Sequence, residues 1–222
     1  MKNREIIEQI AHIVQDPSYS HPMLLAKAND GIGRVAALVD LPDLKSSAEV
    51  ATDTSNPFVA LPTVAGNTFH VGKKDALFFV ASQGQGVERN IVESWIKFLQ
   101  KYPRLDETGD VIDVCVRANL LYYQGVPSTA DTLDLHFYRK PVVMVNPSDE
   151  PDGIPDHLQR NLLVNFGCWD CYSEIEDDES GRTPNTDKYE KRFYQAVSEL
   201  KAYLGVPDAR PEHYEYDTED FI

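Results

Sequence analysis

Two cysteines are the first residues in this sequence whose spacing could support chemistry. Cys168 and Cys171 form a Cys-x-x-Cys pair, which occurs in zinc sites and in redox-active thiol proteins. A structural zinc site needs two more ligands, and the remaining cysteine, Cys115, lies in a predicted strand. A redox pair favours the start of a helix after a strand, whereas this pair lies late in a predicted helix. We therefore interpret the cysteines as small apolar residues and predict no bound metal.

The segment Gly84-Gln85-Gly86 is a second candidate, because it follows an apolar strand and precedes a predicted helix. A phosphate group can bind at a helix N-terminus in such a position. The segment lacks the third glycine of a dinucleotide-binding fingerprint and the Gly-Lys-Ser/Thr of a P-loop. We interpret it as a flexible connection and predict no cofactor.

The histidines and carboxylates show no catalytic spacing either. The six histidines form neither His-x-His nor His-Glu-x-x-His, and no serine lies in a Gly-x-Ser-x-Gly motif. The pairs Asp177/Asp178 and Glu219/Asp220 are adjacent in predicted loops, whereas catalytic carboxylates occupy contrasting environments. We interpret these carboxylates as solvated surface charge and expect that the protein is not an enzyme.

Composition restricts the remaining function classes. The chain has 222 residues, of which 42% are hydrophobic, so it can bury a core. Its net charge of −15 argues against non-specific DNA binding and suits a surface that repels DNA, mimics DNA or docks on a basic partner. No secretory signal or membrane-spanning run is visible, and three cysteines are typical of a protein kept in a reducing cytoplasm.

Helical periodicity occurs at both ends of the sequence and strand-like alternation in its middle. The predicted terminal helices span residues 3–15, 20–41, 155–173 and 186–204. The candidate strands are 47–52, 57–61, 68–72, 76–81, 111–124 and 132–139, with one helix over residues 87–102. The last strand alternates most clearly, with Leu133, Leu135 and Phe137 on one face.

These elements predict an α+β fold, a small bundle of about five helices, N- and C-terminal, with an inserted antiparallel β region. The β part is too interrupted for a parallel dinucleotide-binding sheet. We expect four segments: N-terminal bundle helices in 1–45, the β insertion with its helix in 46–141, C-terminal bundle helices in 142–205 and an acidic extended segment in 206–222.

The order of several landmarks resembles that of tailed-bacteriophage head-to-tail adaptor proteins, also called connector, neck or head-completion proteins. Such proteins tend to open with a short amphipathic helix, an Asp-Pro-Ser turn and a longer helix. The corresponding landmarks here are Asp16-Pro17-Ser18, Leu41-Pro42, Ala60-Leu61-Pro62, Tyr138-Arg139-Lys140-Pro141 and the turn Asp149–Pro155. The fourth predicted helix carries less alanine than is common in these proteins, which concerns partner docking more than the fold.

The resemblance implies a structural protein of the virion. Adaptors usually form a ring of about twelve copies beneath the portal, extend the DNA channel and carry the next neck or tail component. The implied partners are further copies of the chain, the portal protein and a downstream neck or tail protein, with genomic DNA passing without specific binding and no membrane. The implied location is the capsid–tail junction, with the host cytoplasm as the place of assembly.

The last segment, Val206–Ile222, holds six acidic residues and one arginine. Our hypothesis is that it becomes ordered on binding the portal or a neighbouring subunit. Its anchors would be Tyr214, Tyr216, Phe221 and Ile222, while its carboxylates meet basic residues of the partner. A disordered solubilising segment is the alternative.

Three other functions remain open from the sequence. A tail terminator or stopper would share the ring but be predominantly β. An acidic inhibitor, either a DNA mimic or an immunity protein, would use the negative charge. A small-molecule enzyme would need a pocket with converging polar groups near Gly84–Gly86.

Overall fold

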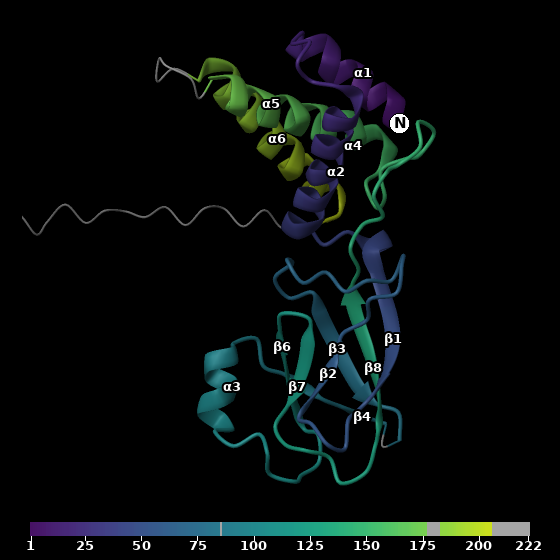
Figure 1. The fold of residues 1–222 in the computed structure, drawn as a ribbon, viewed down its shortest axis with the longest axis vertical. Coiled ribbons are helices and arrows are strands. Elements are labelled where there is room, and N and C mark those ends of the chain that lie inside the picture. The colour runs from purple at the N-terminus through teal and green to yellow at the C-terminus, as the bar shows by residue number, and fades with distance from the viewer. Residues whose placement is uncertain (85, 177–182, 206–222) are drawn as a thin grey trace, which may run out of the picture.

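The protein is elongated, with helices at one end and β-sheets at the other (Figure 1). This computed structural model describes residues 1–84, 86–176 and 183–205. The predicted α+β class is confirmed. Buried apolar residues form two separate clusters, one among the helices and one between the sheets.

The helical end is a bundle built from both ends of the chain (Figure 1). Its helices are α1 (Asn3–Val14), α2 (His21–Leu38), α4 (Asp156–Gln159), α5 (Asn165–Glu176) and α6 (Pro184–Tyr203). A π-helical turn, Arg160–Val164, joins α4 to α5, so these elements together form the helix that the sequence predicts after Pro155. Four predicted helices therefore lie in the bundle, and the fifth lies beside the sheets.

Local sequence accounts for the ends of the first two helices. Ile6 and Ile10, on the apolar stripe of α1, are fully buried. Gln15 ends α1 in the left-handed conformation with φ 54°, and the Asp16 carboxylate then accepts the Ser18 amide. Ser20 precedes α2, and a proline lies in the first turn of that helix, as expected.

Two glycines allow α1 and α2 to approach α5 closely. A Cβ atom on Gly31 of α2 would lie 2.9 Å from the Phe166 ring, and one on Gly167 of α5 would lie 2.5 Å from Cδ1 of Ile10. Gly31 lowers the helical propensity of α2, but its missing side chain makes room for Phe166. An apolar core surrounds these contacts and includes Leu24, Val35, Leu162, Phe193 and Leu200.

The other end of the molecule consists of two four-stranded sheets, with strand orders β1-β8-β3-β4 and β2-β7-β6-β5. The strands are β1 (Lys45–Ala51), β2 (Phe58–Ala60), β3 (Leu77–Ser82), β4 (Val87–Glu88), β5 (Asn90–Ile91), β6 (Asp113–Arg117), β7 (Leu120–Tyr123) and β8 (Thr132–Tyr138). Pairing is antiparallel except between β5 and β6, which are parallel. The β part is therefore mostly antiparallel, as predicted, with one parallel pair.

Strand β8 shows the predicted alternation. Leu133, Leu135 and Phe137 are fully buried between the sheets. Tyr138, on the opposite face, is also buried because its ring belongs to the core of the helical bundle. The end of β8 thus contributes to both parts of the protein.

The helix predicted over residues 87–102 is wrong in its first half. Residues 87–91 form β4 and β5, and α3 (Trp95–Lys101) begins only after Ser94, whose hydroxyl accepts the Lys97 amide. Gly86, with φ 62°, lies in the turn that brings β4 back against β3. Pairing within a sheet therefore overrides the helical period in this stretch. Gly84 and Gly86 lie between two strands and not before a helix, and Gln85 lies outside the described residues.

Two predicted strands also differ from the structure. Within 68–72 only Phe69 makes a bridge, to Arg139, so this stretch is a loop. The predicted strand 111–124 is a hairpin of β6 and β7, which Ala118 interrupts with φ 54°. The carboxylate pairs Asp177/Asp178 and Glu219/Asp220 and the C-terminal candidates Tyr214, Tyr216, Phe221 and Ile222 lie outside the described residues.

Candidate functional site at the joint between bundle and sheets

Lys73, in the loop before β3, reaches from the sheets to the C-terminal end of α2. Its Nζ donates to the carbonyl oxygens of Ala36 (3.1 Å) and Val39 (3.0 Å) and forms an ion pair with Asp40 (2.8 Å). Carbonyls at this end of a helix lack partners within the helix and carry partial negative charge, so an ammonium group stabilises them. The Lys73 side chain is only 3% exposed, which shields these contacts from water.

Arg139, directly after β8, forms a two-point ion pair with Asp152, with N–O distances of 2.5 and 3.0 Å. The same guanidinium donates to the carbonyl oxygen of Asp43 (3.3 Å). Burial opposes ionisation of Asp152, but hydrogen bonds from Arg139 and the Val142 amide outweigh it and lower the pKa of this carboxyl. One side chain thus ties the end of β8 to two other segments.

Backbone hydrogen bonds reinforce these side-chain contacts. The Arg139 amide donates to the Leu44 carbonyl (2.9 Å), and the His70 amide donates to the Tyr138 carbonyl (3.1 Å). Gly153 has φ 77°, and a Cβ atom there would lie 2.9 Å from Cγ of Leu44. The turn Asp149–Pro155 therefore requires glycine at this position to pack against the start of the sheets.

The chain between β8 and α4 is also fixed to the bundle. Asp149 accepts the amides of Val145 and Asn146 (2.7 Å each), and these bonds lower the pKa of its carboxyl. The side chain of Asn29 in α2 donates to the Met144 carbonyl (3.0 Å) and accepts the Met144 amide (2.9 Å). This segment is thus held at several points although it contains no regular strand.

We call the set Asp40, Lys73, Tyr138–Lys140, Asp152 and Gly153 the joint. It unites the landmarks Tyr138–Pro141 and Asp149–Pro155, which are separate in sequence. Lys73, Arg139 and Asp152 each make an ion pair or carbonyl hydrogen bond within it. Such paired charges favour a structural role, which is to fix the bundle relative to the sheets.

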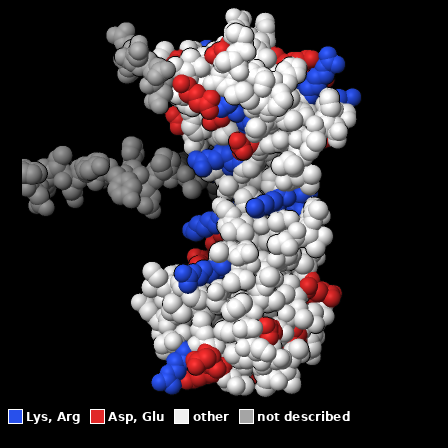
Figure 2. All heavy atoms as spheres, in the orientation of Figure 1, with Lys and Arg blue, Asp and Glu red and all other residues white. Residues whose placement is uncertain are grey.

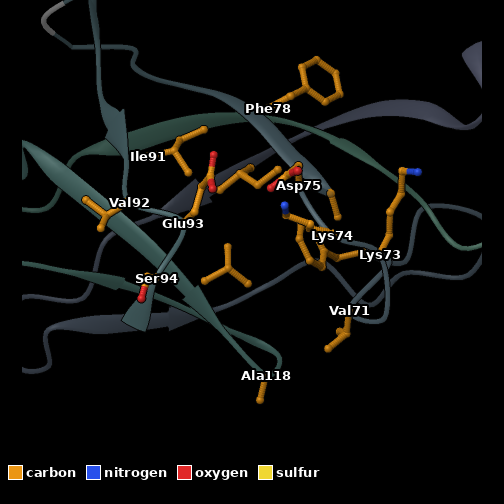
Figure 3. Close-up of a pocket in the computed structure, with 14 residues that line it drawn as sticks. Val71, Lys73, Lys74, Asp75, Phe78, Ile91, Val92, Glu93, Ser94 and Ala118 are labelled. Atoms are coloured by element: carbon orange, nitrogen blue, oxygen red, sulfur yellow. The ribbon is translucent and has the colours of Figure 1, made fainter. Parts of the chain in front are cut away.

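A groove of about 590 Å³ lies beside the joint, between β3 with its preceding loop and the segment around β5 (Figure 3). Lys74 and Asp75 lie on one side of it and Glu93 on the other (Figure 3). Val71 and Phe78 are 46% and 42% exposed along it. No histidine or cysteine is among the described residues that line it. Mixed charges and exposed apolar side chains suit a contact surface better than acid–base or nucleophilic chemistry.

A family model for the SU10 adaptor protein matches residues 1–212. The chain belongs to the SU10 adaptor family. This is a family of phage head-to-tail adaptors, so the resemblance inferred from the sequence landmarks is confirmed. The match spans the bundle, the sheets and the joint together. No curated protein matches the chain.

The cysteines of this adaptor are all buried, and Cys168 and Cys171 belong to the bundle core. Cys168 and Cys171 are fully buried in α5, and burial raises the pKa of each thiol to about 12. Cys115 is fully buried in β6, away from that pair in sequence and in fold. Among the described residues, no group of three or more His, Cys, Asp or Glu side chains could hold a metal ion. High thiol pKa values leave little thiolate for redox chemistry.

Charges on the adaptor's surface are mixed on the face drawn in Figure 2, where acidic and basic side chains lie near one another. Several basic side chains lie at the waist between the two ends of the molecule (Figure 2). None of the described helices is both long and apolar enough to cross a bilayer.

Sequence reasoning did not identify Lys73, Asp40 or Asn29 as important. A lysine in a polar loop carries no local signal, because its partners, the α2 carbonyls, are distant in sequence. Arg139 and Asp152 lie within the sequence landmarks, but only the fold reveals that they pair. The C-terminal candidates were named from their aromatic and acidic pattern and stay a prediction.

Proposed function

We propose that this SU10 adaptor is the subunit of a ring of about twelve copies that lies beneath the portal at the neck of a phage particle. The ring extends the DNA channel and carries the next neck or tail protein. In this role the protein is a structural part of the virion and not an enzyme. It is made in the host cytoplasm and joins the capsid–tail junction during assembly.

The family match over residues 1–212 is the observation that carries this proposal. The joint supports it, because a ring subunit transmits force between neighbours and needs its two parts held in a fixed relation. The net charge of −15 supports passage of DNA without specific binding, since acidic residues offer the phosphates no contacts. The helical bundle counts against a tail terminator or stopper, for which we expect a predominantly β protein.

Quantitative mass spectrometry of purified phage particles tests the proposal. We expect this chain in about the same copy number as the portal protein. Hundreds of copies per particle would indicate a capsid or tail-tube component and contradict the neck position. Absence from particles together with tight binding to a DNA-processing enzyme would favour an acidic inhibitor.

We further propose that the C-terminal segment, residues 206–222, binds the portal or a neighbouring copy through Tyr214, Tyr216, Phe221 and Ile222. Neither described core cluster includes a residue beyond Leu204, so truncation after Gly205 should leave the fold intact. Attachment to the portal should then be lost. Particles that still acquire tails with the truncated chain would rule this out.

We also propose that residues 46–141 are an insertion into a bundle formed by 1–45 and 142–205. The two separate core clusters support this division. Limited proteolysis of the full chain under partly denaturing conditions tests it, because the β part should survive as a resistant fragment of about these bounds after the bundle has been cleaved.

A further inference from the structure

Three valines after β8 form an exposed apolar segment. Val142, Val143 and Val145 are 52%, 62% and 68% exposed, whereas Met144 between them is 2% exposed. Met144 thus anchors the segment to the bundle core, and the valines on either side of it face solvent. We call residues 142–145 the valine segment. Consecutive exposed β-branched residues of this kind suit contact with another chain.

The backbone of the valine segment is held in place by the adaptor itself, with one exception. Asp152 accepts the Val142 amide (2.7 Å), Asn29 binds both backbone groups of Met144, and Asp149 accepts the Val145 amide (2.7 Å). The N–H and C=O of Val143 have no hydrogen-bond partner among the described residues. Because successive residues of an extended chain direct these groups to alternate sides, the Val143 groups point away from Asn29. They are open to a pairing chain.

A hollow of about 230 Å³ adjoins the valine segment. Its lining combines Ile32 and Gly33 of α2 with His70 and the residues from Lys140 to Val143. Lys140 is its one formally charged residue, and no carboxylate of the described residues lines it. A Cβ atom on Gly33 would meet nothing within 4 Å, so the helix leaves open space here. The hollow can admit a ring-sized apolar side chain with an acidic neighbour.

The C-terminal segment of the chain has the matching pattern. In His213-Tyr214-Glu215-Tyr216-Asp217-Thr218, tyrosines alternate with carboxylates, which is the period of an extended strand with one aromatic and one acidic face. Tyr203, near the end of α6, contacts the His157 ring at 4.8 Å between ring centres, and His157 lies in the turn of helix that follows Asp152. Helix α6 therefore ends near the joint, and a chain of the length of residues 206–222 could span roughly 55 Å if fully extended.

We propose that the valine segment and its hollow bind the C-terminal segment of a neighbouring copy in an extended conformation. The N–H and C=O of Val143 pair with its backbone, Tyr214 or Tyr216 fills the hollow, and the carboxylates lie beside Lys140. The inference rests on the proposed ring, which needs two different faces on each copy. Addition of an extended segment to exposed backbone is a common mode of peptide recognition.

Cysteine cross-linking of the full-length chain tests the contact in assembled material. One preparation carries Val143→Cys and a second carries Tyr216→Cys with a tag of different mass. The native cysteines are fully buried, so they should not react under mild oxidation. We expect a disulfide-linked heterodimer on a non-reducing gel after the two are mixed. Ile96→Cys is the matched control for Val143→Cys, because Ile96 is 69% exposed and lies on α3 at the far end of the molecule (Figure 1).

Cross-linking of Val143→Cys at no more than the level of Ile96→Cys would overturn the proposal. A double variant, Val143→Cys with Tyr216→Cys, that forms only a loop within one chain would overturn the assignment to a neighbouring copy. Electron microscopy of the wild-type chain tests the ring separately from the proposed contact. Rings without this cross-link contradict the contact alone, whereas absence of rings contradicts the proposed function itself.

A second pair of variants tests the backbone pairing. Val143→Pro removes the free N–H and should be tolerated by the fold, since that group has no partner within the described residues. We expect it to raise the concentration needed for half-maximal assembly roughly tenfold. Val143→Thr keeps the N–H and the β-branched shape and should assemble like the wild type. Equal assembly of both variants, with unchanged circular dichroism, would contradict the pairing.

Discussion

The bundle and the sheets of this adaptor are built from the chain in different ways. The bundle joins helices from the two ends of the chain, and its contacts include the Tyr172 hydroxyl bound to the Ile13 carbonyl across most of the sequence. The sheets are built from one continuous stretch, residues 45–138, in which most neighbouring strands are antiparallel. Each part has its own buried cluster, with Phe193 in one and Phe137 in the other.

Because each part has its own apolar core, the two parts are held to one another mainly by polar contacts at the joint. Within each core, shape and apolar area dominate, and many residue combinations can serve. At the joint, Lys73 and Arg139 must each meet defined oxygen atoms. This explains why two sequence landmarks that are separate in the chain, Tyr138–Pro141 and Asp149–Pro155, meet at the joint.

Removing one large ring from each core should have the largest effect. Phe193→Ala and Phe137→Ala should each cost about 3–5 kcal/mol of unfolding free energy, because both rings are fully buried. Hydrogen exchange should show lost protection mainly in the bundle for the first and mainly in the sheets for the second. Tyr194→Ala, which truncates a 39% exposed neighbour of Phe193, is the control and should cost far less. Identical exchange patterns for both core variants would mean that the two parts unfold as one unit.

Lys73→Met should have the next largest effect, about 2–3 kcal/mol, because it removes the charged donor to the Ala36 carbonyl, one of two donors to the Val39 carbonyl and the ion pair with Asp40. Urea denaturation followed by circular dichroism measures the loss. Lys74→Met removes a neighbouring exposed charge and should change stability little. If the two variants are equally stable, the helix end does not depend on the lysine.

The two glycines of α2 should give effects of opposite sign. Gly31→Ala should destabilise the protein by about 1–3 kcal/mol, because the new methyl group meets the Phe166 ring. Gly33→Ala meets nothing within 4 Å and should stabilise α2 by up to about 1 kcal/mol. Thermal melts of both variants measure the two effects, and stabilisation by Gly31→Ala would show that helix propensity outweighs packing at this position.

The smallest expected effect is a pH dependence of stability from His70, which lies beside the joint. Burial, together with the charges of Lys73 and Lys140, lowers the pKa of His70 below its ordinary value of 6.5. Just below pH 6.5 the unfolded chain therefore binds more protons at this residue than the folded one, and stability falls as the pH falls. His70→Gln should flatten the dependence of the melting temperature on pH in this range. An unchanged slope in His70→Gln would exclude His70 as its source.

The sequence predicted the parts better than their connection. Apolar stripes such as Ile6 and Ile10 depend only on helical period, so the terminal helices were found. The helix predicted over residues 87–102 was wrong in its first half, because the pairing of Val87 with Ser82 depends on the turn at Gly86 and not on the local period. The joint could not be predicted for a similar reason, since an ion pair such as Arg139–Asp152 produces no periodic pattern in the sequence.

The divided origin of the bundle also affects how the chain folds as it leaves the ribosome. Helices α1 and α2 emerge first, but α5 and α6, which cover their apolar stripes, are translated only after the sheets. At about 5–20 residues per second, the isoleucines of α1 stay uncovered for many seconds. The sheets can close during that interval. A nascent chain of this adaptor should therefore offer a chaperone its N-terminal helices until its last helix is made.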